Sequence, residues 1–142
     1  MSRDMTHEEW RSFLLEGTRT GKLATVRRDG RPHVAPIWFT LDGDDVVFTT
    51  GATSVKGRSL REDARVALCV DDERPPFSFV IVEGTAEISE DLDELLRWAT
   101  ELGARYMGRE VAESFGRRNA VAGELLVRMH VDRVVAHADI AD

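Results

Sequence analysis

The stretch of residues 21–50 constrains the fold most, because it alternates strand-like runs with dipeptides that form tight turns. It reads GKLATVRRDGRPHVAPIWFTLDGDDVVFTT and contains Asp29-Gly30 and Asp42-Gly43. Asp-Gly dipeptides supply the positive φ angles that hairpin turns require. The stretch therefore predicts three consecutive antiparallel strands.

Further strand-like runs follow this meander. They read RVALCVDD, FSFVIVEGTAEIS and, near the C-terminus, ELLVRMHVDRVVAHADI. The apolar residues of the last run do not keep a strict alternation, which predicts a bulge. Five or six antiparallel strands indicate a small β-barrel, and any open edge of such a barrel is commonly covered by a second subunit. We therefore expect a homodimer.

Helices are predicted before the first strand and between the later strands. Thr6 and Glu9 have capping-box spacing and start a helix that runs to about Glu16. After Ser89, taken as the cap, apolar residues recur on one helical face as far as Tyr106. A shorter helix is expected over residues 110–118. The predicted fold is an α+β arrangement dominated by a six-stranded antiparallel split β-barrel with flanking helices.

Length and composition fit one domain spanning residues 1–142. The chain is 42% hydrophobic, so it can bury a core without covalent staples. Cys69 is the single cysteine, cannot close an internal disulfide, and fits a reducing compartment. The first residues, MSRDMTHEEW, lack the apolar run of a secretory signal, and no segment approaches a membrane span. We expect a soluble cytoplasmic protein.

The net charge of −7 is distributed unevenly along the chain. Residues 1–68 hold eleven basic against ten acidic residues, whereas residues 69–142 hold eight against sixteen. An acidic protein is a poor non-specific ligand of nucleic acid, because attraction of phosphates needs an extended basic face. The locally basic first half remains compatible with a compact anionic ligand.

The run TTGATSVKGRSLRED concentrates cations after a strand that ends at about Thr50. Ser54 is placed to cap a short helix over residues 55–60, and Lys56 falls in its first turn. A helix start presents unpaired N–H groups and partial positive charge, so an anion can bind there. Arg58 and Arg61 fall on a different helical face from Lys56. The alternative is that these cations form a solvated face paired with nearby acidic residues.

Pro36 is the unusual residue of the second strand. Because it has no N–H, it marks an edge, a bulge, or a place where something other than a strand lies alongside. A planar ligand beside residues 36–38 satisfies this condition. An edge strand with Trp38 packed in the core satisfies it equally.

No side chain is assigned a catalytic role. The four histidines have no spacing typical of a metal site, so we expect none. Tyr106 and His33 are the two possible proton donors, but both fall on apolar faces and are interpreted as structural.

The motifs G-x-L-A-T, D-G-x-P-H-V-x-P-I-W-F and S-x-K-x-x-x-L-R occur in this order over residues 17–88. With these three motifs the chain resembles the split-barrel flavin/deazaflavin oxidoreductases related to pyridoxamine 5′-phosphate oxidase. The particular resemblance is to the actinobacterial members that use the deazaflavin coenzyme F420. It implies a homodimeric six-stranded split barrel with two cofactor sites at the dimer interface.

The resemblance also implies which residues bind the cofactor. The backbone of Pro36, Ile37 and Trp38 would lie against the ring system. Ser54 and Lys56 would hold the phosphate. The site would also include Thr50 at the strand end and the Leu-Arg pair, Leu60 and Arg61. The polyglutamate tail of the coenzyme could meet further cations, which are Arg27, Arg28, Arg31 or Arg58. Ser59 stands where many relatives have Asn, which removes one expected polar contact.

Three functions follow from the resemblance. The leading one is a coenzyme F420-dependent reductase that transfers a hydride from the reduced deazaflavin to an unsaturated or oxidised small organic substrate. The second is an FMN-binding flavoprotein of the same fold, and the third is a non-catalytic coenzyme-binding protein. The substrate itself is not identified by the sequence. An apolar pocket could be lined by Trp38, Phe77, Phe79 and Trp98, but ordinary positions in the core are an equal alternative for these residues.

Overall fold

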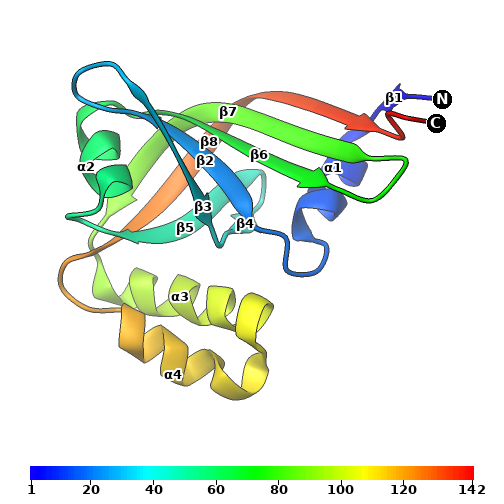
Figure 1. Cartoon of the computed structure of the whole chain (residues 1–142). Helices are drawn as coiled ribbons and strands as arrows, with labels where there is room; N and C mark the ends of the chain where they lie inside the picture. Colours follow the sequence, from blue (N-terminus) through cyan, green and yellow to red (C-terminus); the bar gives the residue numbers. More distant parts are fainter.

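The computed structural model describes residues 1–142 and contains one eight-stranded antiparallel sheet with four helices (Figure 1). The strands are β1 (Arg3–Asp4), β2 (Gly21–Val26), β3 (Pro32–Ile37), β4 (Thr40–Asp42), β5 (Asp45–Gly51), β6 (Arg65–Asp72), β7 (Ser78–Ser89) and β8 (Glu124–Ala138). The helices are α1 (His7–Leu15), α2 (Val55–Glu62), α3 (Leu92–Met107) and α4 (Arg109–Asn119). The β-dominated split-barrel fold predicted from the sequence is confirmed.

Both Asp-Gly dipeptides form the turns that the sequence predicts. Gly30 has φ of 89° between β2 and β3, and Gly43 has φ of 61° between β4 and β5. Residues other than glycine adopt such angles at a cost, so these two positions fix where the strands reverse.

The strands are hydrogen-bonded in the order β3-β2-β6-β7-β8-β5-β4, with β1 added beside β8. β3 is therefore an edge strand, which explains how it accommodates Pro36. The number of strands is eight, against six predicted. The two-residue β1 is one addition, and the other arises because the second predicted strand breaks at Trp38 and Phe39, so that Thr40 begins the separate β4.

The longest strand, β8, has the predicted irregularity. Glu83 of β7 pairs with Arg133, but the next residue, Gly84, pairs with Val131, so Asp132 is the extra residue of a bulge. A Cβ at Gly84 would clash with the carbonyl group of His130. The bulge and the glycine therefore depend on one another.

The inner face of the curved sheet encloses the main core. Its fully buried members include Leu23, Phe39, Phe48 and Met129, and α1 adds Trp10 and Leu14. The capping box of α1 forms as predicted, because the Thr6 hydroxyl accepts from the N–H of Glu9 and the Glu9 carboxylate accepts from the N–H of Thr6. No helix of the chain has both the length and the apolar character needed to cross a membrane.

Helices α3 and α4 form a hairpin on the outside of the barrel, inserted between β7 and β8 (Figure 1). The cap of α3 is Asp91, whose carboxylate accepts from the N–H groups of Asp93 and Glu94; the predicted cap, Ser89, instead accepts from the N–H of Asp91. The two helices pack closely because glycines meet side chains, Gly103 against Phe115 and Gly116 against Thr100.

Candidate functional site

A cavity of about 210 Å³ lies where the end of β3, the start of α2 and the α3–α4 hairpin meet. Its lining residues are Pro36, Ile37, Trp38, Thr49, Lys56, Leu102 and Phe115. Of the residues predicted to bind the cofactor, those that come together here are Pro36, Ile37, Trp38 and Lys56. The cavity has one apolar wall and one cationic end.

Trp38 forms the apolar wall together with two aromatic residues of the helical hairpin. Its ring stacks on Tyr106 with a centroid distance of 4.8 Å and an angle of 9° between planes, and it contacts Phe115 at 5.6 Å. Trp38 remains 38% exposed, so it does not pack in the barrel core. The edge-strand interpretation of Pro36 is correct, but the core position of Trp38 that accompanied it is wrong.

Tyr106 holds this wall against the barrel. Its hydroxyl donates to the carbonyl of Arg19 at 2.7 Å and accepts from the N–H of Phe39 at 3.1 Å. Burial raises the pKa of Tyr106 above its ordinary value. The hydroxyl is thus bound to the backbone, and the structural interpretation of Tyr106 fits better than proton donation.

The neighbouring Arg105 anchors the same helix end. Its guanidinium donates to three carbonyl oxygens: those of Phe39 and Leu14, each at 2.6 Å, and that of Gly17 at 3.1 Å. Burial of the guanidinium lowers the pKa of Arg105 from its ordinary value, although it remains a cation. The hairpin that forms one side of the cavity is therefore fixed at the C-terminal end of α3.

At the other end of the cavity, Ser54 caps α2 as predicted. Its Oγ accepts from the N–H of Gly57 at 3.0 Å and donates to the carbonyl of Gly51 at 2.8 Å. The Thr50 hydroxyl, 2.9 Å away, is then the donor to Ser54. Both hydroxyls support the turn before α2, and it is Thr49, the residue next to Thr50, that lines the cavity.

Lys56 is the cation of the cavity. It is half-buried and makes no hydrogen bond and no ion pair within 4.0 Å in the protein. The first N–H groups of α2, those of Val55 and Lys56, have no acceptor within a helix, and they donate to no other backbone group. An unpaired cation and free N–H donors at one helix start form a site that suits a phosphate group.

The other cations of this region point elsewhere. Arg61 pairs with Glu90 at 3.3 Å, and Arg58 donates to the carbonyl of Thr53 at 3.1 Å. Neither lines the cavity. The division of cations between helical faces that the sequence predicts is therefore present, with Lys56 alone facing the cavity.

His33 and the other predicted aromatic residues lie outside the cavity. His33 stands opposite Thr25 in the β2–β3 ladder, and its Nδ1 is buried without a partner. Of the aromatic residues considered for an apolar pocket, Phe77, Phe79 and Trp98 do not line this cavity. Trp98 packs in a small cluster with Leu95, Phe79 contacts His137, and Phe77 lies in the loop before β7.

Phe115 and Leu102 were not singled out in the sequence. Both belong to amphipathic helices whose apolar faces indicated only mutual packing. The close approach of α3 and α4 at Gly103 and Gly116 turns Phe115 toward Trp38. This depends on contacts distant in the chain, which leave no local signal.

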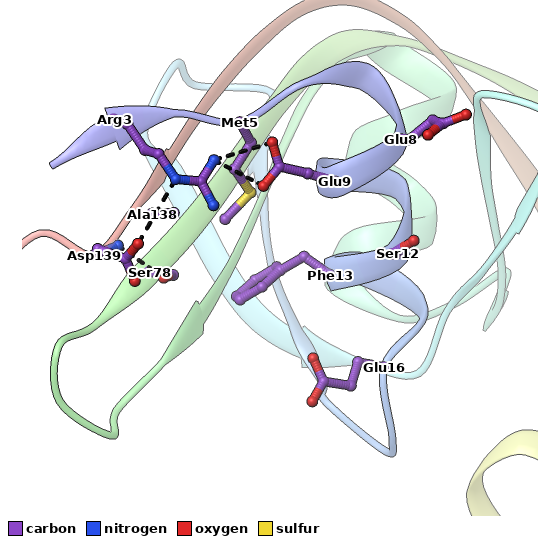
Figure 2. Close-up of a pocket in the computed structure, with 10 residues that line it drawn as sticks. All are labelled: Arg3, Met5, Glu8, Glu9, Ser12, Phe13, Glu16, Ser78, Ala138 and Asp139. Atoms are coloured by element: carbon purple, nitrogen blue, oxygen red, sulfur yellow. Dashed lines mark hydrogen bonds and ion pairs between the residues drawn. The ribbon is translucent and has the colours of Figure 1, made fainter.

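A second hollow, of about 400 Å³, lies beside α1 near the chain termini and is shown in Figure 2. Carboxylates dominate it: Glu8, Glu9, Glu16 and Asp139 are among its lining residues. Its one cation, Arg3, already bridges Glu9 at 2.7 Å and Asp139 at 3.7 Å (Figure 2). The charge of this hollow disfavours a phosphate, so the cavity at Lys56 is the better anion site.

The fold and the cavity define a split-barrel protein whose cavity suits a ligand with an apolar part and an anionic group. The chain matches the pyridoxamine 5′-phosphate oxidase family over residues 6–138 and belongs to that family. The family resemblance seen in the sequence is thereby confirmed.

Three solved structures show the range of similar proteins. A conserved hypothetical protein of Mycobacterium tuberculosis, Rv2991, is 28% identical with a TM-score of 0.84, covering 95% of this chain and 86% of that one. An F420 reductase is also 28% identical, with a TM-score of 0.68 over 87% of this chain and 94% of that one. An FAD-binding protein of Mesorhizobium loti has the same fold at 20% identity, with a TM-score of 0.68 and 96% coverage of both chains.

Proposed function

We propose that the protein is a coenzyme F420-dependent oxidoreductase that transfers a hydride from the reduced deazaflavin to an unsaturated or oxidised small organic molecule. The observation that carries the proposal is the cavity, which has an unpaired Lys56 at one end and the residues 36–38 of an edge strand at the other. The 28% identity to an F420 reductase supports the choice of coenzyme.

The residues of the cavity fit such a coenzyme. Lys56 and the first N–H groups of α2 would hold the phosphate. β3 is an edge strand, so one row of its backbone groups faces outward and is free to bond a planar ring. The stacked Trp38 and Tyr106 supply an apolar surface beside that edge.

The coenzyme supplies the hydride chemistry when bound, and the chain supplies orientation and a dry environment. Trp38 and Phe115 exclude water from one side of the cavity. Lys56 neutralises phosphate charge at the far end from the ring. No side chain is needed to accept or donate the hydride, in agreement with the absence of an assigned catalytic residue.

We also propose that the protein is a homodimer. The outer face of β2, β3 and β6 carries Val34, which is 63% exposed, beside the paired residues Ala24 and Ala67. Cys69 and Ile81 lie on the same face, where the charged residues Lys22 and Glu83 border the apolar side chains. Exposed apolar surface on neighbouring strands is typical of a subunit interface.

The test is a fluorescence titration of the apo-protein with oxidised coenzyme F420, run beside FMN at the same ionic strength. Micromolar binding of the deazaflavin with none of FMN supports the proposal. Tight FMN binding without a deazaflavin response assigns the protein to the FMN-binding alternative. Binding followed by no hydride transfer to any acceptor, including quinones and unsaturated lactones, identifies a non-catalytic coenzyme-binding protein.

Lys56→Met and Arg117→Met form the matched pair for this titration. Both remove one positive charge, but Arg117 is exposed on α4 and pairs only with Glu113. Loss of affinity in Lys56→Met alone places the phosphate at α2. Equal affinities in both variants remove Lys56 from the site.

A further inference from the structure

Glu124 lies beside the cationic end of the cavity. It is the first residue of β8 and pairs with Gly51, the last residue of β5 before the turn into α2. Side chains two residues apart share a face of a strand, so Glu124 lies on the face of Leu126, which pairs with the cavity residue Thr49. Gly51 has no side chain, and a Cβ built there would meet nothing within 4 Å. The ladder thus leaves open space in front of Glu124.

Glu124 is half-buried, and one oxygen of its carboxyl group is poorly compensated. Its Oε2 is buried and has no hydrogen-bond partner. Burial raises the pKa of Glu124, while the nearby Lys56 acts in the opposite direction. A buried carboxylate without hydrogen bonds is unfavourable unless a cation faces it.

Of the charged groups on the elements around Glu124, Lys56 is the one that acts on the pKa of its carboxyl group. Across the ladder on β5 stands the uncharged Gly51. Beyond the end of β7, Glu90 is engaged with Arg61 at 3.3 Å. The basic end of α4 holds Arg117, which pairs with Glu113 at 3.8 Å, and the exposed Arg118.

We infer that Glu124 sets the charge that the Lys56 end of the cavity accepts, favouring a singly charged phosphodiester over a doubly charged phosphate monoester. The inference rests on the proposed function in one respect, the placement of a phosphate at Lys56. With Glu124 ionised, its charge cancels that of Lys56. A second negative charge on the phosphate is then repelled by the carboxylate, and no further cation compensates this repulsion.

The two candidate coenzymes differ in this property. FMN carries a phosphate monoester, which is close to doubly charged above pH 7. Coenzyme F420 carries its phosphate as a diester, with a single charge. Glu124 is therefore a residue that selects between cofactors of similar ring size through the phosphate rather than through the ring.

The experiment compares wild type with Glu124→Gln in titrations with FMN and with coenzyme F420 at pH 8 and pH 5. At pH 8 we expect the variant to bind FMN about tenfold more tightly, the equivalent of roughly one pKa unit of interaction. We expect a gain of no more than about threefold for F420 if its phosphate, with half the charge, is the group that faces Glu124; a larger gain would mean that carboxylates of the polyglutamate tail also reach Glu124 and would overturn the inference. At pH 5 a larger fraction of the wild-type carboxyl is protonated than at pH 8, because burial raises its pKa, and the FMN phosphate also carries less charge, so both differences should shrink.

Glu101→Gln is the matched control. Glu101 is exposed on α3 and makes no ion pair, so the variant has the same change in net charge without a change at the cavity. The inference is overturned if Glu124→Gln leaves FMN affinity unchanged at pH 8, or strengthens both coenzymes equally. Equal effects of Glu101→Gln and Glu124→Gln would also overturn it, because they would reduce Glu124 to a contribution to net charge.

A second readout separates this inference from the proposed function. If neither coenzyme binds, the proposed function fails, and inorganic phosphate becomes the probe in thermal unfolding. A larger phosphate-induced rise in Tm for Glu124→Gln than for wild type at pH 8, and a smaller difference between the two proteins at pH 5, supports the inference alone. Identical shifts in the two proteins at both pH values overturn it as well.

Discussion

The indole of Trp38 and the phenol ring of Tyr106 lie nearly parallel, 4.8 Å apart, although the two residues belong to the edge of the barrel and to the end of α3. The stack adds to the contact between the hairpin and the barrel, because α3 also packs on the outer face of the barrel through Leu95 and Trp98 against Val47 and Leu126. The Tyr106 hydroxyl fixes its own ring to the backbone of Arg19 and Phe39, so Tyr106 is the fixed partner and Trp38 rests on it. Stability and ligand binding should accordingly respond to different members of this pair.

Tyr106→Phe keeps the stacked ring but removes the hydroxyl. The N–H of Phe39 and the carbonyl of Arg19 each lose a partner, which should lower the free energy of unfolding by about 1–3 kcal/mol. Urea denaturation followed by circular dichroism measures the change. Unaltered stability would show that water replaces the hydroxyl without cost.

Arg105→Met should lower the free energy of unfolding by more than the position of Arg105 on a helix suggests. The variant loses donation to the carbonyls of Leu14, Gly17 and Phe39, and we expect a loss of about 3 kcal/mol, since hydrogen bonds to charged groups are the stronger kind. Hydrogen exchange should show faster opening of α3. Arg109→Met, at an exposed residue, is the control and should stay within about 0.5 kcal/mol of wild type.

Gly57→Ala and Gly51→Ala make the same chemical change at two positions, but we expect different effects on the stability of the protein. Alanine ordinarily stabilises a helix by about 1 kcal/mol over glycine. At Gly57, however, a Cβ would collide with the carbonyl of Gly51, whereas at Gly51 it would meet nothing within 4 Å. Differential scanning calorimetry should show a lower Tm for Gly57→Ala and none of that loss for Gly51→Ala. A stabilised Gly57→Ala would mean that the turn before α2 relaxes freely.

His130 should make stability depend on pH through its two carboxylate neighbours. Its Nε2 lies 2.6 Å from Glu87 and its Nδ1 3.3 Å from Asp45, and the bond to Glu87 is the main cause of its raised pKa. A raised folded-state pKa stabilises the protein fully below the unfolded value of about 6.5, and this stabilisation disappears as the pH rises through the folded-state value.

The measurement is Tm against pH from 5 to 9, for wild type and Glu87→Gln at low and high salt. Wild type should lose stability relative to the variant across the upper part of this range, and salt should reduce the difference, because the pair is exposed. Parallel Tm curves for the two proteins would exclude a contribution from His130.

Local features of the sequence predicted the fold well. Gly30 and Gly43 take the positive φ of hairpin turns, Thr6 and Ser54 cap their helices, and the irregular pattern of the last strand corresponds to the bulge at Asp132. The turns and the helix caps depend on residues adjacent in the chain, where turn and cap chemistry decides the conformation, whereas the bulge also needs Gly84 of the neighbouring strand.

The candidate site was less predictable, because its walls come from distant segments. Pro36, Trp38 and Lys56 were singled out, but the α3–α4 hairpin that brings Phe115 to Trp38 is placed by contacts of Arg105 and Tyr106 across the barrel. Glu124 was missed for the same reason, since only the β5–β8 register sets it beside the turn into α2.

The hairpin of α3 and α4 leaves β7 and returns at β8, two strands that are already hydrogen-bonded neighbours from Phe79 and His137 to Ser89 and Leu126. Its two ends are therefore held together by the sheet, so that lengthening or shortening it adds little loop-closure entropy. One wall of the cavity is thus a replaceable insert, while the cationic end and the strand edge belong to the barrel. Proteins built on this plan can change one wall of the cavity through the insert, while the cationic end and the strand edge stay the same.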